Sequence, residues 1–198
     1  MFNVNVLNSL KTVGSFILYQ NTFVFMIGPD KSGEKLGIVR LGGHIKENEN
    51  YIQALKREIE EEASVKVKLI NSPYSFYKRN WDDKCYYEIT DNMPLEIKPL
   101  IITGDEARST AVFLAYTEEL PKPSSEAYGI ILLKGNDIKD ICSKKTCLKD
   151  FLKNGGTLIQ QKEFDYDMEI YAGVHLIFLN KLMENGNDLV HRYISGSL

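Results

Sequence analysis

The chain has 198 residues, of which 43% are hydrophobic and 26% are charged, and its formal net charge is −3. Such a chain can bury a sizeable core, and its acidic balance excludes the broad basic surface with which many proteins bind nucleic acid. We therefore expect no stable nucleic-acid binding, although a divalent metal could supply local positive charge for a polyanionic ligand.

The three cysteines are Cys85, Cys142 and Cys147. They are too few and too irregularly spaced for a disulfide framework or a zinc site, which indicates reduced thiols. The apolar segment 16–19 is soon interrupted by polar residues and is far shorter than the roughly 20 residues of a spanning helix. We expect a cytoplasmic protein that has no membrane partner.

The first part of the chain is rich in β-branched and aromatic residues. Residues 13–27 predict two strands, or one strand interrupted at Gln20 and Asn21, followed by a turn-rich connection over residues 28–37. Further strands are expected at 37–41, 65–70, 110–116 and 128–133, and a loop at 121–125.

One helix is expected from about residue 50 to residue 63. Its apolar residues recur at steps of three and four, and so form one stripe along the helix. Asn48 or Asn50 could cap its start. The stripe consists of Ile52, Leu55, Ile59 and Ala63.

Helical signals dominate the last third of the chain. Five of its apolar residues fit one helix face, which would end at the Asn–Gly pair 185–186. Together with the strands, these helices predict a layered domain of the α/β or α+β class. The helix face consists of Met168, Ala172, Leu176, Leu179 and Met183.

The first predicted helix carries a cluster of acidic residues. Glu58, Glu61 and Glu62 are spaced i, i+3 and i+4, so their side chains share one narrow arc. The three charges repel one another and lie near the helix C-terminus, where the helix dipole disfavours anions. A hard divalent cation would relieve both effects, because Mg²⁺ prefers oxygen ligands. The alternative is a solvated acidic face with no ligand.

Eight residues around this cluster follow the pattern G-x5-E-x7-R-E-U-x-E-E-x-G-U, in which U is a bulky aliphatic residue. By this pattern the chain resembles the Nudix hydrolase family. One position departs from it, because Ser64 stands where the family has its second glycine. A left-handed conformation is common at such a position after a helix and disfavours a Cβ by about 1 kcal/mol. The matching residues are Gly43, Glu49, Arg57, Glu58, Ile59, Glu61, Glu62 and Val65.

The resemblance implies a single domain over residues 1–198, built as an α/β/α sandwich with a mixed sheet flanked by helices. Its core would span about residues 13–140, with a helical C-terminal extension over about 141–198. It also implies a metal-dependent pyrophosphohydrolase that cleaves the diphosphate linkage of a nucleotide-like small molecule. The C-terminal third could complete the fold, cover the cleft or form a homodimer contact.

The resemblance further implies roles for the acidic cluster. Glu58, Glu61 and Glu62 would hold Mg²⁺ or Mn²⁺, with the backbone carbonyl of Gly42 as a further ligand. Glu58 and Glu61 would also be catalytic residues. As an alternative to binding the metal, Glu58 could orient or deprotonate the attacking water.

Arg57 and Glu126 complete the expected catalytic set, and Glu49 is expected to give structural support. Arg57 would pair with Glu49 and hold the carboxylates in place. Family members often recruit another acidic residue from a distant loop. Glu126 is the first candidate for that role, in competition with Glu106, Glu118 and Glu119.

Substrate contacts are expected beside the motif and in the aromatic segment 74–87. Gly43 lets the backbone approach a phosphate, and His44 directly follows it, although His44 could equally have no catalytic role. Aromatic rings stack on bases with about 1–3 kcal/mol each, which favours one or two of the aromatic residues in that segment. The residues that we expect to bind substrate are Arg40, Gly43, His44, Arg79 and Trp81.

The sequence does not identify the substrate. Nucleoside triphosphates, nucleotide sugars and dinucleotides all remain open, because the downstream residues that mark individual Nudix subfamilies are not in register. One alternative is a hydrolase of a non-nucleotide diphosphate. Another is a sensing module that binds a nucleotide without cleaving it, although such modules lose glutamates of the motif and none is lost here.

Overall fold

The structure is a computed structural model, and it describes residues 2–90, 92–124 and 127–184. Within these residues, twelve strands form one mixed sheet in the order β10-β12-β3-β2-β1-β8-β7-β5-β6, with β9 and β11 joined at β2, and β4 at β8. The strands are β1 (Leu10–Tyr19), β2 (Thr22–Pro29), β3 (Leu36–Val39), β4 (Lys68–Ile70), β5 (Phe76–Lys78), β6 (Tyr87–Glu88), β7 (Ile101–Gly104), β8 (Ser109–Thr117), β9 (Gly129–Leu133), β10 (Thr146–Cys147), β11 (Thr157–Gln160) and β12 (Glu169–Ala172).

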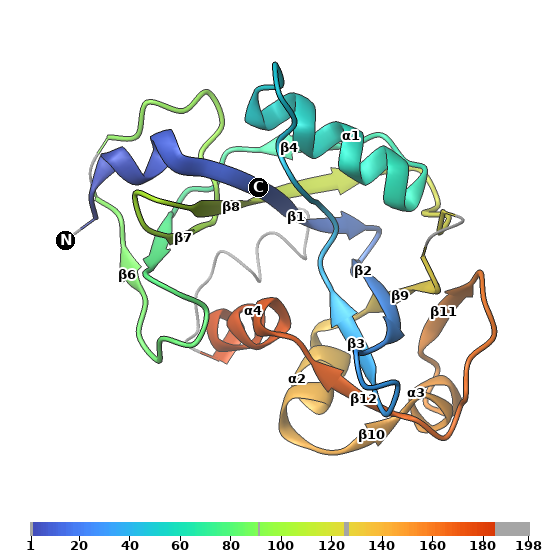
Figure 1. The fold of residues 1–198 in the computed structure, drawn as a ribbon. Coiled ribbons are helices and arrows are strands. Elements are labelled where there is room, and N and C mark those ends of the chain that lie inside the picture. The colour runs from blue at the N-terminus through green and yellow to red at the C-terminus, as the bar shows by residue number, and fades with distance from the viewer. Residues whose placement is uncertain (1, 91, 125–126, 185–198) are drawn as a thin grey trace.

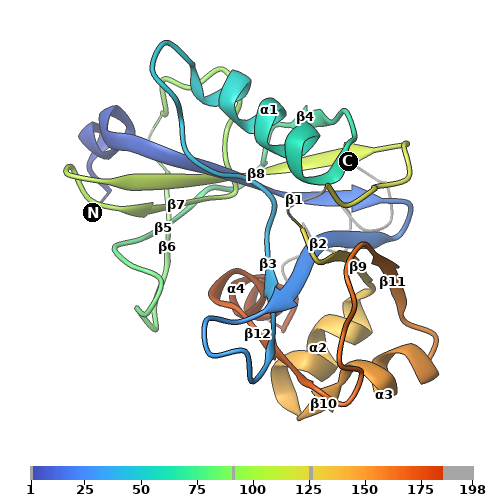
Figure 2. The ribbon, with the colours of Figure 1, turned by 45° about the vertical axis from the view of Figure 1, so that its right-hand side comes forward.

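Helices lie on both faces of this sheet (Figures 1 and 2). Helix α1 covers one face, and α2 and α4 pack together against the other. This is the expected layered α/β architecture, with a mixed sheet between helices. The helical segments are α1 (Tyr51–Ala63), α2 (Gly135–Ser143), α3 (Leu148–Lys153), α4 (Val174–Glu184) and a short 3-10 helix, η1 (Val4–Ser9).

Strand β1 lies in the middle of the sheet and separates two hydrophobic cores. Because successive side chains of a strand point to opposite faces, Val13 and Ile17 join the core under α1, whereas Phe16 and Leu18 join the core over α2 and α4. Gln20, with φ 53°, forms the tight turn into β2. The expected division of residues 13–27 into two strands is therefore confirmed.

Helix α1 begins and ends much as the sequence predicts. Asn50 is the N-cap, and it forms a capping box in which it accepts from backbone N–H groups while the Gln53 side chain accepts from the Asn50 N–H. Ser64 is the C-cap in the left-handed conformation, with φ 54° and ψ 34°. Its N–H donates to the carbonyl of Glu60 at 3.0 Å. The apolar stripe is buried except for Ile52, which is half-buried.

Of the helical extension expected for about residues 141–198, the structure describes the part up to residue 184, and this part contains strands as well as helices. Met168 and Ala172 do not belong to the helix face expected there, because strand β12 runs parallel to β3 and α4 begins only at Val174. Strand β11 pairs with β9. The segment thus adds strands to the central sheet and then places α4 against it. In the described part of the chain, no helix is long and apolar enough to cross a membrane.

Candidate active site at the Gly42–Gly43 turn

The turn between β3 and α1 has two glycines for steric reasons. Gly42 has φ +125°, and a Cβ on it would lie 2.3 Å from the carbonyl oxygen of Val13. A Cβ on Gly43 would lie 2.5 Å from the carboxyl carbon of Glu58. The atom that a Cβ on Gly42 would meet is backbone, so the turn can lie directly against β1 only with glycine at this position. At Gly43 a Cβ would require the carboxyl end of the Glu58 side chain to shift.

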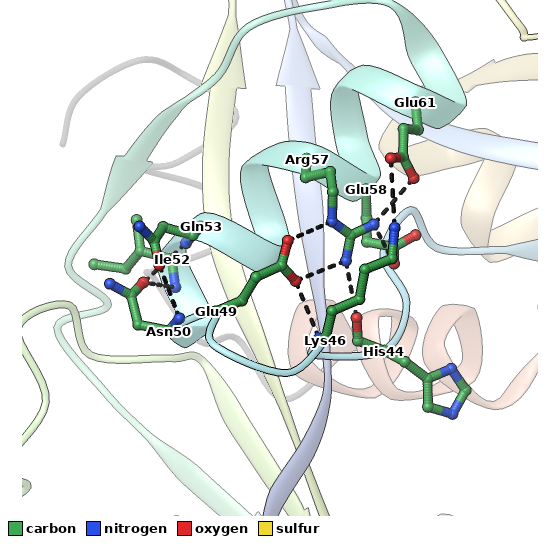
Figure 3. A network of polar contacts seen from close by, with 9 residues as sticks. All are labelled: His44, Lys46, Glu49, Asn50, Ile52, Gln53, Arg57, Glu58 and Glu61. Carbon is green, nitrogen blue, oxygen red and sulfur yellow. Dashed lines mark hydrogen bonds and ion pairs between the residues drawn. The ribbon is translucent and has the colours of Figure 1, made fainter.

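Arg57 organises the exposed side of the site (Figure 3). Its Nε and Nη2 donate to the two carboxylate oxygens of Glu49 at 2.7 and 2.9 Å, a bidentate pair. Its Nη1 donates to Glu58 at 2.8 Å and to Glu61 at 3.0 Å, and its Nη2 also donates to the carbonyl of His44 at 3.0 Å. One guanidinium therefore holds three glutamates and the loop that follows the glycines.

The charges in this network stabilise one another. Hydrogen bonds from Arg57 are the largest reason why the pKa of Glu49 falls to about 2, and the N–H of Lys46 adds to that effect. The same bonds to Glu49 raise the pKa of Arg57 above its ordinary value. The expected pairing of Arg57 with Glu49 is present in the structure.

Glu62 lies on the more buried side of the same helix. Its Oε2 accepts the Gly42 N–H at 2.7 Å, so the carboxylate contacts the turn directly. Burial raises the pKa of Glu62 to about 7, and the negative charges of Glu58 and Glu61 raise it further. The Gly42 N–H and the charge of Arg40 oppose that increase. Glu62 is thus a carboxyl group whose ionisation would be favoured by an additional cation.

The carboxylate cluster, Glu58, Glu61 and Glu62, fits a divalent cation by its donor chemistry. It offers hard oxygen ligands in a place where negative charge is already in excess. In the structure, Arg57 donates hydrogen bonds to Glu58 and Glu61. Among the described residues, no group of three His, Cys, Asp or Glu side chains is already arranged as a metal site. The ligand set, including the Gly42 carbonyl, stays a prediction.

The structure places three expected substrate contacts in different environments. The exposed His44 ring points away from Glu58 and Glu61 (Figure 3). Its Nε2 lies 3.3 Å from Nη2 of Arg108. Arg79 is exposed, and its backbone carbonyl accepts the Gly104 N–H at 3.1 Å. Trp81 packs into the core on the side of α4. The substrate-binding roles of His44, Arg79 and Trp81 stay predictions.

Arg40, also expected to bind substrate, is only 7% exposed and lies beneath the turn. Its Nη1 donates to the carbonyls of Val13 and Leu41, at 3.0 and 3.2 Å, and its Nε donates to Nε2 of His175 at 3.1 Å. Burial lowers the pKa of Arg40 to about 10. The sequence indicates only a packing role for His175, because the long-range contact with Arg40 leaves no local pattern.

Glu126, the expected additional acid, lies outside the described residues. The loop just before it docks on the C-terminal end of α1, because the Ser124 N–H donates to the carbonyl of Glu62 at 3.1 Å. Two of its competitors have partners elsewhere: Glu106 is hydrogen-bonded to Asn3, and Glu119 accepts the backbone N–H of Lys66 at 3.2 Å. The role of Glu126 stays a prediction.

No family model matches the sequence, and no curated protein matches it closely enough to count as a relative. Several solved structures are similar to the chain. A NUDIX-family hydrolase from Clostridium perfringens is 22% identical, with 67% of this chain and 84% of that one covered and a TM-score of 0.48.

Two further structures are similar over comparable lengths. A NUDIX hydrolase from Nitrosomonas europaea is 20% identical, with 65% of this chain and 58% of that one covered and a TM-score of 0.41. An ADP-ribose pyrophosphatase from Streptococcus suis is 14% identical, with 65% and 75% covered and a TM-score of 0.40. The solved structures to which the chain is similar thus include hydrolases of this family and a pyrophosphatase, each matched over about two thirds of the chain.

Proposed function

We propose that the chain is a metal-dependent Nudix-type hydrolase that cleaves the diphosphate linkage of a nucleoside-diphosphate-linked small molecule by attack of water. The observation that carries this proposal is the position of the carboxylate cluster on α1, directly against the Gly42–Gly43 turn. The Gly42 N–H donates to Oε2 of Glu62 at 2.7 Å, and a Cβ on Gly43 would lie 2.5 Å from the carboxyl carbon of Glu58. Oxygen ligands and a closely approaching backbone thus meet at one point.

The three carboxylates share one task in this proposal, and Glu58 has a second. Glu58, Glu61 and Glu62 would hold the Mg²⁺ or Mn²⁺ ion, together with the Gly42 carbonyl. The bound cation would neutralise the diphosphate and acidify the attacking water. Glu58 would orient that water or accept its proton, with Glu126 as a second acidic residue. Arg57 would keep Glu58 and Glu61 in place and would not touch the reacting atoms.

The three cysteines, which are free, support a reducing compartment such as the cytoplasm for this activity. A homodimer through the C-terminal third stays a prediction, and the contacts of β12 and α4 with the sheet favour a role of this segment in the fold itself.

The test is release of phosphate or nucleoside monophosphate from a panel of diphosphates, with and without Mg²⁺ or Mn²⁺. The panel contains nucleoside triphosphates, ADP-ribose, nucleotide sugars, NADH, dinucleoside polyphosphates and non-nucleotide diphosphates. Glu61→Gln is the test variant, and Glu60→Gln is the matched control, because Glu60 is exposed on the same helix at an unconstrained motif position.

We expect metal-dependent cleavage of one substrate class, lost in Glu61→Gln and kept in Glu60→Gln. Cleavage of only the non-nucleotide members would replace the nucleotide part of the proposal. Tight nucleotide binding without any cleavage would instead identify a sensing module.

A further inference from the structure

A buried arginine connects the candidate active site with the C-terminal helix. The Arg40 side chain starts at the end of β3 and lies on the face of the sheet that α4 covers, where its guanidinium has three acceptors. Two are the backbone carbonyls of Val13 and Leu41, and the third is Nε2 of His175 on α4. Removing a charged group from water costs several kcal/mol unless its hydrogen bonds are replaced, so these acceptors determine where the guanidinium can lie.

The guanidinium fills the space directly beneath the glycine turn. A Cβ on Gly14 would lie 1.8 Å from Nη1 of Arg40, and a Cβ on Gly42 would lie 2.7 Å from the same atom. Val13, whose carbonyl accepts from Arg40, is also hydrogen-bonded to the turn, because its N–H donates to the carbonyl of Gly43 at 2.9 Å. A change in the position of Arg40 would therefore move the support of Gly42 and Gly43.

His175 is itself held in a fixed orientation. The Trp81 ring packs on the His175 ring with centroids 4.3 Å apart and an interplanar angle of 57°. The Phe178 ring in turn packs on Trp81, with centroids 6.3 Å apart. The loop that carries Trp81 is fixed in turn, because Nζ of the buried Lys78 donates to the Trp81 carbonyl at 3.0 Å. Since arginine can only donate, Nε2 of His175 must be the unprotonated nitrogen of the ring.

We propose that Arg40 and His175 are positioning residues, through which helix α4 holds the Gly42–Gly43 turn in place against the carboxylate cluster. The expected effect on metal binding and activity rests on the proposed function, since the turn must stay in place to present Gly42 to metal and phosphate. This proposal gives the C-terminal third a role in the site, although none of its residues belongs to the motif. Removing a residue that orients the metal-binding groups without touching the metal typically lowers metal affinity or activity by about 10–100-fold.

The experiment compares two substitutions of the same residue in the full chain. His175→Leu removes the acceptor for Arg40, whereas His175→Gln keeps a side-chain oxygen that can accept the Nε–H. Ile177→Ala is the matched control on α4, because Ile177 is 41% exposed and lies about 200° around the helix from His175. The readouts are the hydrogen-exchange rate of the Gly42 amide, the affinity for Mn²⁺ without substrate, and kcat and KM for whichever diphosphate is cleaved.

We expect His175→Leu to accelerate Gly42 amide exchange about tenfold and to weaken Mn²⁺ binding about tenfold, the lower end of the range for a supporting residue. We expect kcat to fall with little change in KM, and His175→Gln to recover most of each effect. The ¹⁵N spectrum of the wild-type His175 ring should show a proton on Nδ1. Unchanged exchange and Mn²⁺ affinity in His175→Leu, or a proton on Nε2, would overturn the proposal.

A second variant keeps the test decisive if His175→Leu does not fold. Arg40→Lys keeps the buried charge but lacks the Nε–H that His175 accepts, so it should also accelerate exchange at Gly42, and unchanged exchange would overturn the proposal. Exchange and Mn²⁺ binding need no substrate. An inactive wild type would therefore contradict the proposed function while these two readouts still decide the positioning role.

Discussion

Helices α1 and α4 act on the same turn from opposite faces of the sheet, and they do so with different chemistry. Helix α1 contributes charge: it carries Arg57 and the carboxylate cluster, of which the Glu61 side chain is 54% exposed. Helix α4 contributes one neutral imidazole in a largely apolar surface, and burial lowers the pKa of His175 to about 3, with the charge of Arg40 lowering it further. We infer that the outer side of α1 supplies the reacting groups and that the sheet-facing side of α4 fixes the backbone between them.

The largest expected effect is on the charged side. Glu61→Gln should reduce metal-dependent hydrolysis by roughly 10²–10³-fold, the range for removing one preorganised electrostatic contact. The fold should survive, because the Glu61 side chain is 54% exposed. Steady-state kinetics at saturating Mg²⁺ measure the loss, with Glu60→Gln expected to keep full activity. Near-normal turnover in Glu61→Gln would mean that the assigned metal site is wrong.

The second effect is the pH dependence of stability without metal. Folding raises the pKa of Glu62 from 4.5 to about 7, so the folded state binds its proton more tightly than the unfolded state does. The corresponding stabilisation is present below pH 4.5 and is lost as the pH rises to about 7, by up to about 3 kcal/mol.

Urea unfolding of chelator-treated protein at pH 4.5 to 8 measures this dependence. Glu62→Gln should flatten the curve over that window, because the amide does not titrate, and saturating Mg²⁺ should also reduce its slope. Equal slopes for the wild type and Glu62→Gln would contradict the raised pKa.

A smaller effect is expected from Arg57→Lys, which keeps the charge but cannot form the bidentate pair with Glu49. It should cost about 1–2 kcal/mol of stability, because charged hydrogen bonds are lost. Activity should fall about tenfold, since Glu58 and Glu61 lose the guanidinium that holds them. Thermal unfolding and kinetics measure both, and Lys56→Gln on the exposed side of α1 is the control. A variant with wild-type values would show that Arg57 does not organise the cluster.

The smallest effect concerns the end of α1. Ser64→Gly should stabilise the protein by about 1 kcal/mol or less, because the left-handed C-cap disfavours a Cβ, and it should leave kcat unchanged. Ser64→Ala keeps the Cβ and should show no gain in a denaturation curve. Destabilisation by Ser64→Gly would mean that the serine hydroxyl contributes more than the backbone conformation costs.

The two helices also differ in how far the sequence predicts them. The boundaries and cap of α1, its buried stripe and the pairing of Arg57 with Glu49 follow from spacings of at most eight residues. The contacts of α4 join residues far apart in the chain, such as Arg40 and His175, and a single sequence contains no local pattern for them. The same reason explains β12: Met168 and Ala172 fit a helical spacing, but pairing with β3 places them in and beside a strand.

The most direct test of the account is a calorimetric titration of Mn²⁺ and of Mg²⁺ into the wild type, Glu61→Gln and Glu60→Gln, without substrate. The account predicts saturable binding to the wild type and Glu60→Gln, and binding that is at least about tenfold weaker in Glu61→Gln, as expected when one ligand of the ion is lost. Indistinguishable isotherms for all three proteins, or no saturable binding to the wild type, would contradict a metal site at the carboxylate cluster.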